Sequence, residues 1–203
     1  FLWPDPSTLS VLPWRPTQGR VVRMFCDIRK PDGSPFRRDS RYLLKQAILE
    51  AEKMGIACYF GAEFEFYLFK TDENGDSTNI PFDHASYMDI APEDRGENIR
   101  RDICLTLVDM GIYPEGSHHE EGPGQNEIDF RYSDALTAAD NAVTFKSVVK
   151  AIAMQNGLYA CFDPKPLEHC SGNGLHINIS LQSPNGKKDT DSFIAGILHY
   201  VRE

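Results

Sequence analysis

Apolar residues recur at helical spacing in several long segments of the chain, and most of these segments are bounded by residues typical of helix ends. Asp39 and Asp134 are well suited to cap the start of a helix, while Gly55 and Gly111 are suited to end one. Together, spacing and caps predict helices over residues 39–55, 93–110, 134–157 and 191–203.

Short runs rich in β-branched and aromatic residues predict strands over 20–28, 56–70 and 175–181. In the middle run Phe64 and Phe66 alternate with Glu63 and Glu65, so that strand has one acidic face. Because helices and strands follow no regular βαβ rhythm, the predicted fold class is α+β, with a largely antiparallel sheet and flanking helices.

Residues 1–20 differ in composition from the rest of the chain. They contain four prolines and both tryptophans, which predicts an extended lead-in or an edge strand rather than a helix. The chain also begins with Phe1 and ends inside a helical pattern. We therefore expect it to be a piece of a longer polypeptide.

The composition is that of an ordinary globular protein. Of 203 residues, 41% are apolar and 25% are charged, which suits a buried core and excludes a disordered or fibrous chain. A formal net charge of −9 argues against nucleic acid or an anionic membrane surface as a partner. No apolar run approaches the roughly 18 residues of a membrane span, and no signal peptide is recognisable, so we expect a cytoplasmic protein.

Cysteine usage excludes two further classes. The five cysteines are odd in number and form no CxxC pair, which argues against a disulfide framework and a four-cysteine zinc site. We expect reduced thiols. A zinc site around Cys161, His169 and Cys170 is disfavoured because no fourth ligand lies within reach along the sequence.

Glu63 and Glu65 are the first residues with candidate chemistry. Residues two apart on a strand face the same side with Cα atoms roughly 6.5–7 Å apart, which suits two neighbouring cations better than one. The alternative is that these carboxylates form the solvated face of an amphipathic strand.

A second segment, SHHEEGPGQNEIDF (117–130), crowds polar and ionisable groups around a glycine-rich turn. Glu120 and Glu127 offer the oxygen ligands that Mg²⁺ and Mn²⁺ favour. His118 and His119 would suit a softer metal only if both faced inward, which a strand forbids. An exposed acidic hairpin is the alternative interpretation.

A third segment, KPLEHCSGNGLHINISL (165–181), places His176, Asn178 and Ser180 on one face of a strand after a Gly-x-Gly turn. Taken alone, a histidine in a strand is more often a hydrogen-bonded core residue than a ligand. A short glycine turn by itself is also weak evidence for phosphate binding.

Together and in this order, EFEF, HHEEGPGQNE and KPLEHCSGNGLHINIS resemble the catalytic region of glutamine synthetase, whose patterns are ExE, HHEvxxxGQNE and KP-x-NGSGxHxHxS. The resemblance runs from about residue 20 to residue 203. It implies that residues 1–20 are the end of an N-terminal β-grasp domain or a linker. Residues 21–203 would be the N-terminal part of the catalytic domain, of the family's α+β type.

The resemblance also implies roles for individual residues. Two or more Mg²⁺ or Mn²⁺ ions would be bound, one beside the amino-acid substrate by Glu65, Glu120 and Glu127, and one bridging the phosphates of ATP by Glu63 and His176. The implied nucleotide contacts are Glu115, Tyr132, Asn178 and Ser180, and the implied substrate turn is Ser171 and Gly172. These residues, with ATP as co-substrate, form the site expected from the sequence.

The activity implied is ATP-dependent ligation of ammonia to the γ-carboxylate of L-glutamate through a γ-glutamyl phosphate, in a homo-oligomer. Ser171 and Asn178 depart from the family pattern, which has Asn and His there. A γ-glutamyl ligase for a polyamine or another amine, a non-catalytic structural homologue and a metal-dependent hydrolase are therefore alternatives. Since further family residues lie downstream, we expect residues 1–203 alone to show no ligase turnover.

Overall fold

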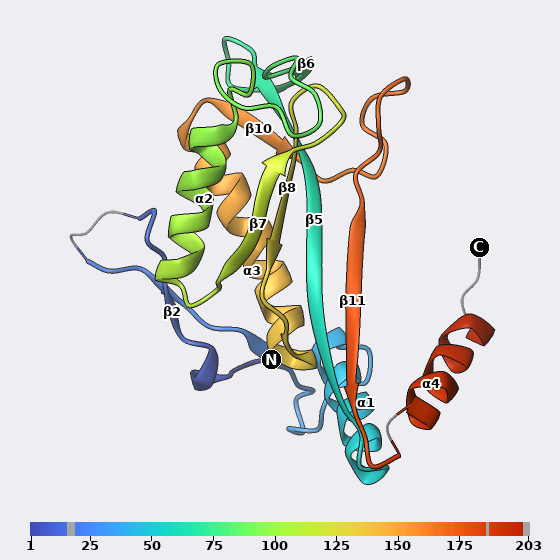
Figure 1. Ribbon diagram of the computed structural model, residues 1–203. Helices are drawn as coiled ribbons and strands as arrows, with labels where there is room; N and C mark the ends of the chain where they lie inside the picture. Colours follow the sequence, from blue (N-terminus) through green and yellow to red (C-terminus); the bar gives the residue numbers. More distant parts are fainter. Residues whose placement is uncertain (16–18, 186, 201–203) are drawn as a thin grey trace.

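The computed structural model describes residues 1–15, 19–185 and 187–200, and one long strand, β5 (Ala57–Thr71), organises them (Figure 1). Within these residues β5 belongs to a seven-stranded sheet in which β10, β8, β11, β6 and β9 pair with it and β7 pairs with β8. Every pairing is antiparallel, so the predicted α+β class is confirmed. The partner strands are β6 (Ser77–Pro81), β7 (Pro114–His119), β8 (Gln125–Phe130), β9 (Ser133–Asp134), β10 (Leu158–Cys161) and β11 (Leu175–Gln182).

The helices largely follow the sequence-based predictions. They are α1 (Ser40–Lys53), α2 (Glu97–Asp109), α3 (Ala135–Gln155) and α4 (Lys187–Tyr200). The side chains of Asp39 and Asp134 accept hydrogen bonds from the first-turn amides of α1 and α3, as their positions predicted. The helix predicted from 93 begins four residues later, after Asp94 has turned inward to pair with Arg100. The predicted end of the last helix, 201–203, lies outside the described residues.

The main core lies between the sheet and the pair α2 and α3, which lie side by side in Figure 1. Phe64 and Phe66 of β5 point to this side, and the Phe64 ring stacks on Phe145 of α3 with centroids 4.9 Å apart. Phe66, Phe145 and Ile128 of β8 are fully buried. Because side chains alternate along a strand, burying Phe64 and Phe66 turns Glu63 and Glu65 to the opposite face.

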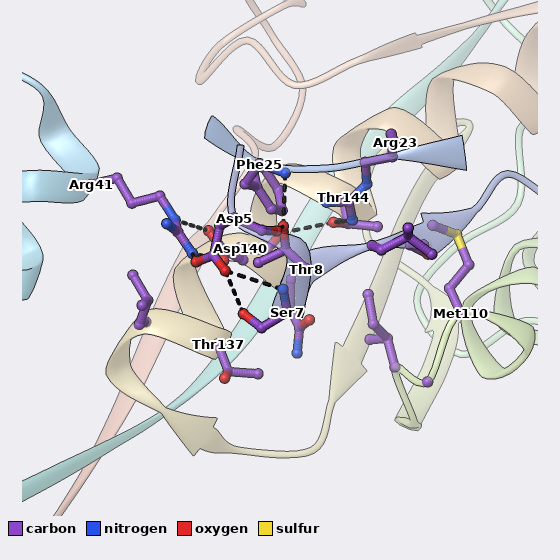
Figure 2. A pocket seen from close by; sticks show the side chains of 16 residues that line it. Asp5, Ser7, Thr8, Arg23, Phe25, Arg41, Met110, Thr137, Asp140 and Thr144 are labelled. Carbon is purple, nitrogen blue, oxygen red and sulfur yellow. Dashed lines mark hydrogen bonds and ion pairs between the residues drawn. The ribbon is translucent and has the colours of Figure 1, made fainter. Parts of the chain in front are cut away.

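The N-terminal segment is tied to the domain by a set of ion pairs. The predicted strand 20–28 is split into β3 (Val22–Arg23), which pairs with β2 (Ser10–Val11), and β4 (Cys26–Ile28), which pairs with β1 (Leu2–Pro4). Arg41 of α1 lies 2.9 Å from Asp5, 2.8 Å from Asp27 and 3.0 Å from Asp140. Figure 2 shows Arg41, Asp5 and Asp140 in the pocket that they help to line. We call Arg41 and its three partners the N-terminal anchor.

On this same side of the sheet, the edge formed by β11 is much less covered than the centre. The side chains of Leu175, Ile177 and Ile179 on β11 face the same side as Phe64 but are 54%, 55% and 42% exposed. In Figure 1, α4 lies beyond β11, away from α2 and α3. None of the helices in the described part of the chain combines the length and apolar composition of a membrane span.

Candidate functional site

Strand register brings the sequence-predicted residues together in two rows across the open face of the sheet. In one row, Glu65 of β5 pairs with Glu127 of β8, which pairs with His118 of β7. In the other, Glu63 lies between His176 of β11 and Asp129 of β8. Three segments far apart in sequence therefore meet on one face of the sheet.

The first row forms what we call the buried half of the site: Glu65, His118, Glu120, Gln125 and Glu127. His118 Nε2 lies 2.9 Å from Glu120 Oε1 and 3.9 Å from Glu127 Oε2. One ligand atom from each of these three residues lies within 4.8 Å of the others, a spacing that suits one bound cation. Glu127 is only 9% exposed, so its carboxyl group is largely removed from water.

The protonation of Glu127 shows how crowded these carboxyl groups are. Its pKa is raised to about 8, mainly by burial, and also by hydrogen bonding with and repulsion from Asp129 and by repulsion from Glu120 and Glu65. The carboxylates thus lack positive charge nearby. An oxygen-rich, cation-poor cluster fits a divalent ion such as Mg²⁺ or Mn²⁺, because a bound cation would offset the repulsion.

The second row forms the exposed half: Glu63, His176, Asn178 and Ser180. His176 Nδ1 lies 3.1 Å from Glu63 Oε2, and Asn178 Nδ2 donates to Glu63 Oε1 at 2.6 Å. The side chain of His176 is 63% exposed. Asn178, which replaces the second histidine of the family pattern, therefore orients Glu63 by a hydrogen bond.

The turn before β11 closes over the buried half. Tyr67 Oη donates to the carbonyl of Ser171 at 2.6 Å, and Gln125 Nε2 donates to the carbonyl of Gly172 at 2.9 Å. Gln125 Nε2 also donates to Glu65 Oε2 at 2.8 Å, which links the turn to β5. A Cβ at Gly174 would lie 2.6 Å from Glu65 Oε1, so a larger residue there would displace the Glu65 carboxylate from its present position.

The residues predicted to contact nucleotide are only partly brought together. Tyr132 packs edge-on against Tyr59 with ring centroids 6.2 Å apart, and Tyr59 pairs in register with Ser180. Tyr132 and Ser180 therefore lie near the same end of β5. Glu115 lies outside both rows, exposed and 3.5 Å from Arg131.

His118 and Gln125 lie in the site, although the sequence assigned neither of them a role there. Alternation along β7 places His118 on the site face and His119 on the core face. The two histidines therefore do not face the same side, as expected for neighbours on a strand. Pairing the two arms of the hairpin that the sequence offered as an alternative would have placed His118 opposite Glu127, which is the arrangement in the structure. The hairpin exists, and its β8 strand is buried, whereas β7 alternates between half-buried and exposed residues as far as the buried His119.

The disfavoured zinc site has no structural support in the described residues. His169 is 91% exposed, and neither of the two clusters of metal-ligating side chains found there includes Cys161, His169 or Cys170. All five cysteines are free, as expected.

Comparison with known proteins supports the resemblance. The family model described as glutamine synthetase, catalytic domain, matches residues 37–203. A glutamine synthetase of Clostridium saccharobutylicum is 48% identical over 99% of this chain, and one of Methanosarcina mazei is 49% identical over 98%. The chain spans 48% and 47% of these two relatives, so it corresponds to about half of their length.

Solved structures agree with this result. A cryo-EM structure of Plasmodium falciparum glutamine synthetase superimposes with a TM-score of 0.86 at 27% identity, covering 98% of this chain and 47% of that one. A structure described as a GmaS/ADP complex gives 0.80 at 33% identity, covering 92% and 43%. The chain therefore belongs to the glutamine synthetase family and comprises part of its catalytic domain.

Proposed function

We propose that this chain contributes the metal-binding and phosphoryl-transfer part of an ATP-dependent ligase that joins ammonia to the γ-carboxylate of L-glutamate. The observation that carries the proposal is the convergence of Glu63, Glu65, Glu120, Glu127 and His176 on one sheet face. Family membership makes glutamine synthesis the leading reaction. ATP, glutamate and ammonia are then the substrates, in a homo-oligomer.

The proposed metal ligands divide between the two halves. Glu65, Glu120 and Glu127, with His118 within reach, would hold one ion, and Glu63 and His176 would hold another. When bound, divalent ions neutralise charge on the phosphoryl group and align it with the attacking oxygen. The carboxylates of this chain would fix where that positive charge lies, because the strand register holds them in place.

The remaining residues orient the substrates. The Ser171–Gly172 turn, held by Tyr67 and Gln125, would bind the amino-acid substrate beside the buried half. Ser180 and Tyr132 would contact the nucleotide at the other end of β5. Transfer of the γ-phosphoryl group to the glutamate side chain gives an acyl phosphate, which provides the leaving group that ammonia needs to form an amide.

The test is phosphate release by the full-length protein with Mg-ATP and glutamate, with and without ammonium. We expect turnover that requires both glutamate and ammonium and that is lost in Glu127→Gln. A Val148→Ala variant, which alters a buried residue of α3 away from the site, shows how much activity is lost through reduced stability alone. Phosphate release that is indifferent to glutamate would contradict the proposal and favour a metal-dependent hydrolase. No release under any condition would favour a structural homologue.

A ligase for a larger amine is the second candidate, and one contact favours testing it. Ser171, which stands where the family pattern has Asn, donates its hydroxyl to Glu121 Oε2 at 3.0 Å. Its hydroxyl is thereby engaged with Glu121, and it lacks the amide donor of Asn. Turnover with methylamine or a polyamine but not with ammonium would identify this alternative.

A further inference from the structure

Behind the site, on the core side of the sheet, Asp83 makes hydrogen bonds with three residues from two separate segments. The amide of Gly124 donates to Asp83 Oδ1 at 3.0 Å, and the amide of Arg95 donates to Oδ2 at 3.0 Å. His119 Nε2 lies 2.9 Å from Oδ1. Asp83 is 4% exposed and His119 is fully buried, so these contacts are shielded from water.

His119 continues the connection to the candidate metal site. Its other ring nitrogen, Nδ1, lies 2.6 Å from the carbonyl oxygen of Glu120. A carbonyl oxygen only accepts, so Nδ1 carries a hydrogen. The amide of Glu120 donates to the carbonyl of Gln125 at 2.9 Å, so both backbone groups of Glu120 are held.

The charges on this pair agree with the geometry. Burial by itself would lower the pKa of His119, but the hydrogen bonds to Asp83 and to the Glu120 carbonyl outweigh it and raise the pKa. Burial would raise the pKa of Asp83, but His119 and the two backbone amides outweigh it and lower the pKa. Both ring nitrogens of His119 thus face acceptor oxygens, the carbonyl of Glu120 on one side and the carboxylate of Asp83 on the other.

A second metal site is a weaker interpretation of the same residues. Asp83, Asp94 and His119 have ligand atoms close enough to hold an ion. However, Asp94 is already paired with Arg100, whose guanidinium lies 2.5 and 3.1 Å from its two carboxylate oxygens. Arg100 supplies the positive charge that a cation would bring, so the cluster is a buried ion-pair network.

We propose that Asp83 and His119 are positioning residues for the candidate metal ligand Glu120. Asp83 holds Gly124 directly and Glu120 through His119, which are the two ends of the 120–124 turn. The Glu120 carboxylate thereby stays beside Glu127 and His118, despite the repulsion between the Glu120 and Glu127 carboxylates. This inference rests on the proposed function, because it takes Glu120 to be a metal ligand.

The experiment measures Mn²⁺ binding to the full-length protein by the loss of the free-Mn²⁺ electron paramagnetic resonance signal, alongside thermal unfolding without metal. His119→Gln keeps a donor near the Nε2 position, toward Asp83, and loses the one toward Glu120. His119→Asn keeps a donor near Nδ1, toward Glu120. We expect His119→Gln to weaken Mn²⁺ binding about 10- to 100-fold, as loss of groups supporting metal ligands does. His119→Asn should recover most of that loss.

Two controls separate the possible outcomes. Thr144→Val removes a buried hydroxyl that donates to the Asp140 carbonyl, far from the turn, and should lower stability without changing Mn²⁺ affinity. Glu127→Gln should abolish the site. If His119→Gln loses stability as Thr144→Val does but binds Mn²⁺ like wild type, the positioning role is wrong while the proposed function stands. If wild type and Glu127→Gln bind Mn²⁺ equally or not at all, the proposed function fails and the inference fails with it.

Discussion

The two halves of the site share strand β5 but differ in how firmly the chain holds them. In the buried half, Glu127 is 9% exposed and is flanked by strands on both sides. In the exposed half, His176 is 63% exposed on β11, which pairs only with β5 in the described part of the chain. Interactions between charges are stronger where water is excluded. The first half is thus held by burial and hydrogen bonding. In the second half, His176 and Asn178 are held by a single strand pairing and by their exposed contacts with Glu63.

The largest expected effect is in the buried half. Glu127→Gln keeps the size of the side chain but removes a proposed ligand, and we expect metal-dependent activity to fall more than about 100-fold, beyond the cost of losing a supporting group. Because the pKa of Glu127 is raised to about 8, Gln resembles the neutral form of this side chain at pH 7 without metal, so the melting temperature without metal should stay the same or rise. A large drop in melting temperature would indicate that Glu127 is structural.

A smaller effect is expected in the exposed half. His176→Asn removes a proposed ligand that is already solvated, so metal affinity should fall about 10-fold, the lower end of the range for groups around a metal site. The measurement is the metal concentration that gives half-maximal phosphate release. A loss as large as that of Glu127→Gln would mean that exposure does not separate the two halves.

The turn between the halves should give a still smaller effect. Ser171→Asn restores the residue of the family pattern and its amide donor. One added hydrogen bond is worth about 1 kcal/mol, or roughly fivefold, so the KM for glutamate should fall by that factor with kcat little changed. Glu121→Gln is the matched control, because it weakens the contact with Ser171 without adding a donor at residue 171. An unchanged KM would show that Ser171 does not contact the substrate.

Stability can be compared across the sheet with the same substitution. Ile128 on β8 is fully buried, whereas Ile177 on β11 is 55% exposed. Ile128→Val should lower the free energy of unfolding by about 1 kcal/mol, and Ile177→Val should change it by less than about 0.5 kcal/mol. Chemical denaturation measures both. Equal costs would mean that another surface covers Ile177 in solution.

The N-terminal anchor contributes no side chain to either half of the site, so its effect on stability can be measured separately from metal binding. Hydrogen bonds from Ser7 and Arg41 lower the pKa of Asp5, and at Asp27 those from Lys45 and Arg41 outweigh the opposing effect of burial. Carboxyl groups with lowered pKa contribute stability above their unfolded value, about 3.9, and lose it as the pH falls through the folded value. Between pH 5 and pH 2 the melting temperature of the wild type should therefore fall more steeply than that of Arg41→Gln. Parallel curves would contradict this role.

The sequence was most informative where local rules act. The caps Asp39 and Asp134 and the alternation around Glu63 and Glu65 predicted two helices and the central strand. The strands β7 and β8 were considered only as an alternative, an exposed hairpin, because the residues that line the site make them polar. The pairing of β8 with β5, which buries β8, is a long-range contact. For the same reason, His118 was not assigned and the partnership of Asp83 with His119 was not foreseen.

Two glycines of the 120–124 turn leave no room for a side chain. A Cβ at Gly122 would overlap Tyr67 Oη, and one at Gly124, whose φ is +70°, would lie 2.8 Å from the carbonyl oxygen of Leu68. Every missense mutation of a glycine codon adds a Cβ. These two codons therefore have no mild substitution, and a replacement at either one in a related gene would indicate that its product has lost this arrangement of the turn.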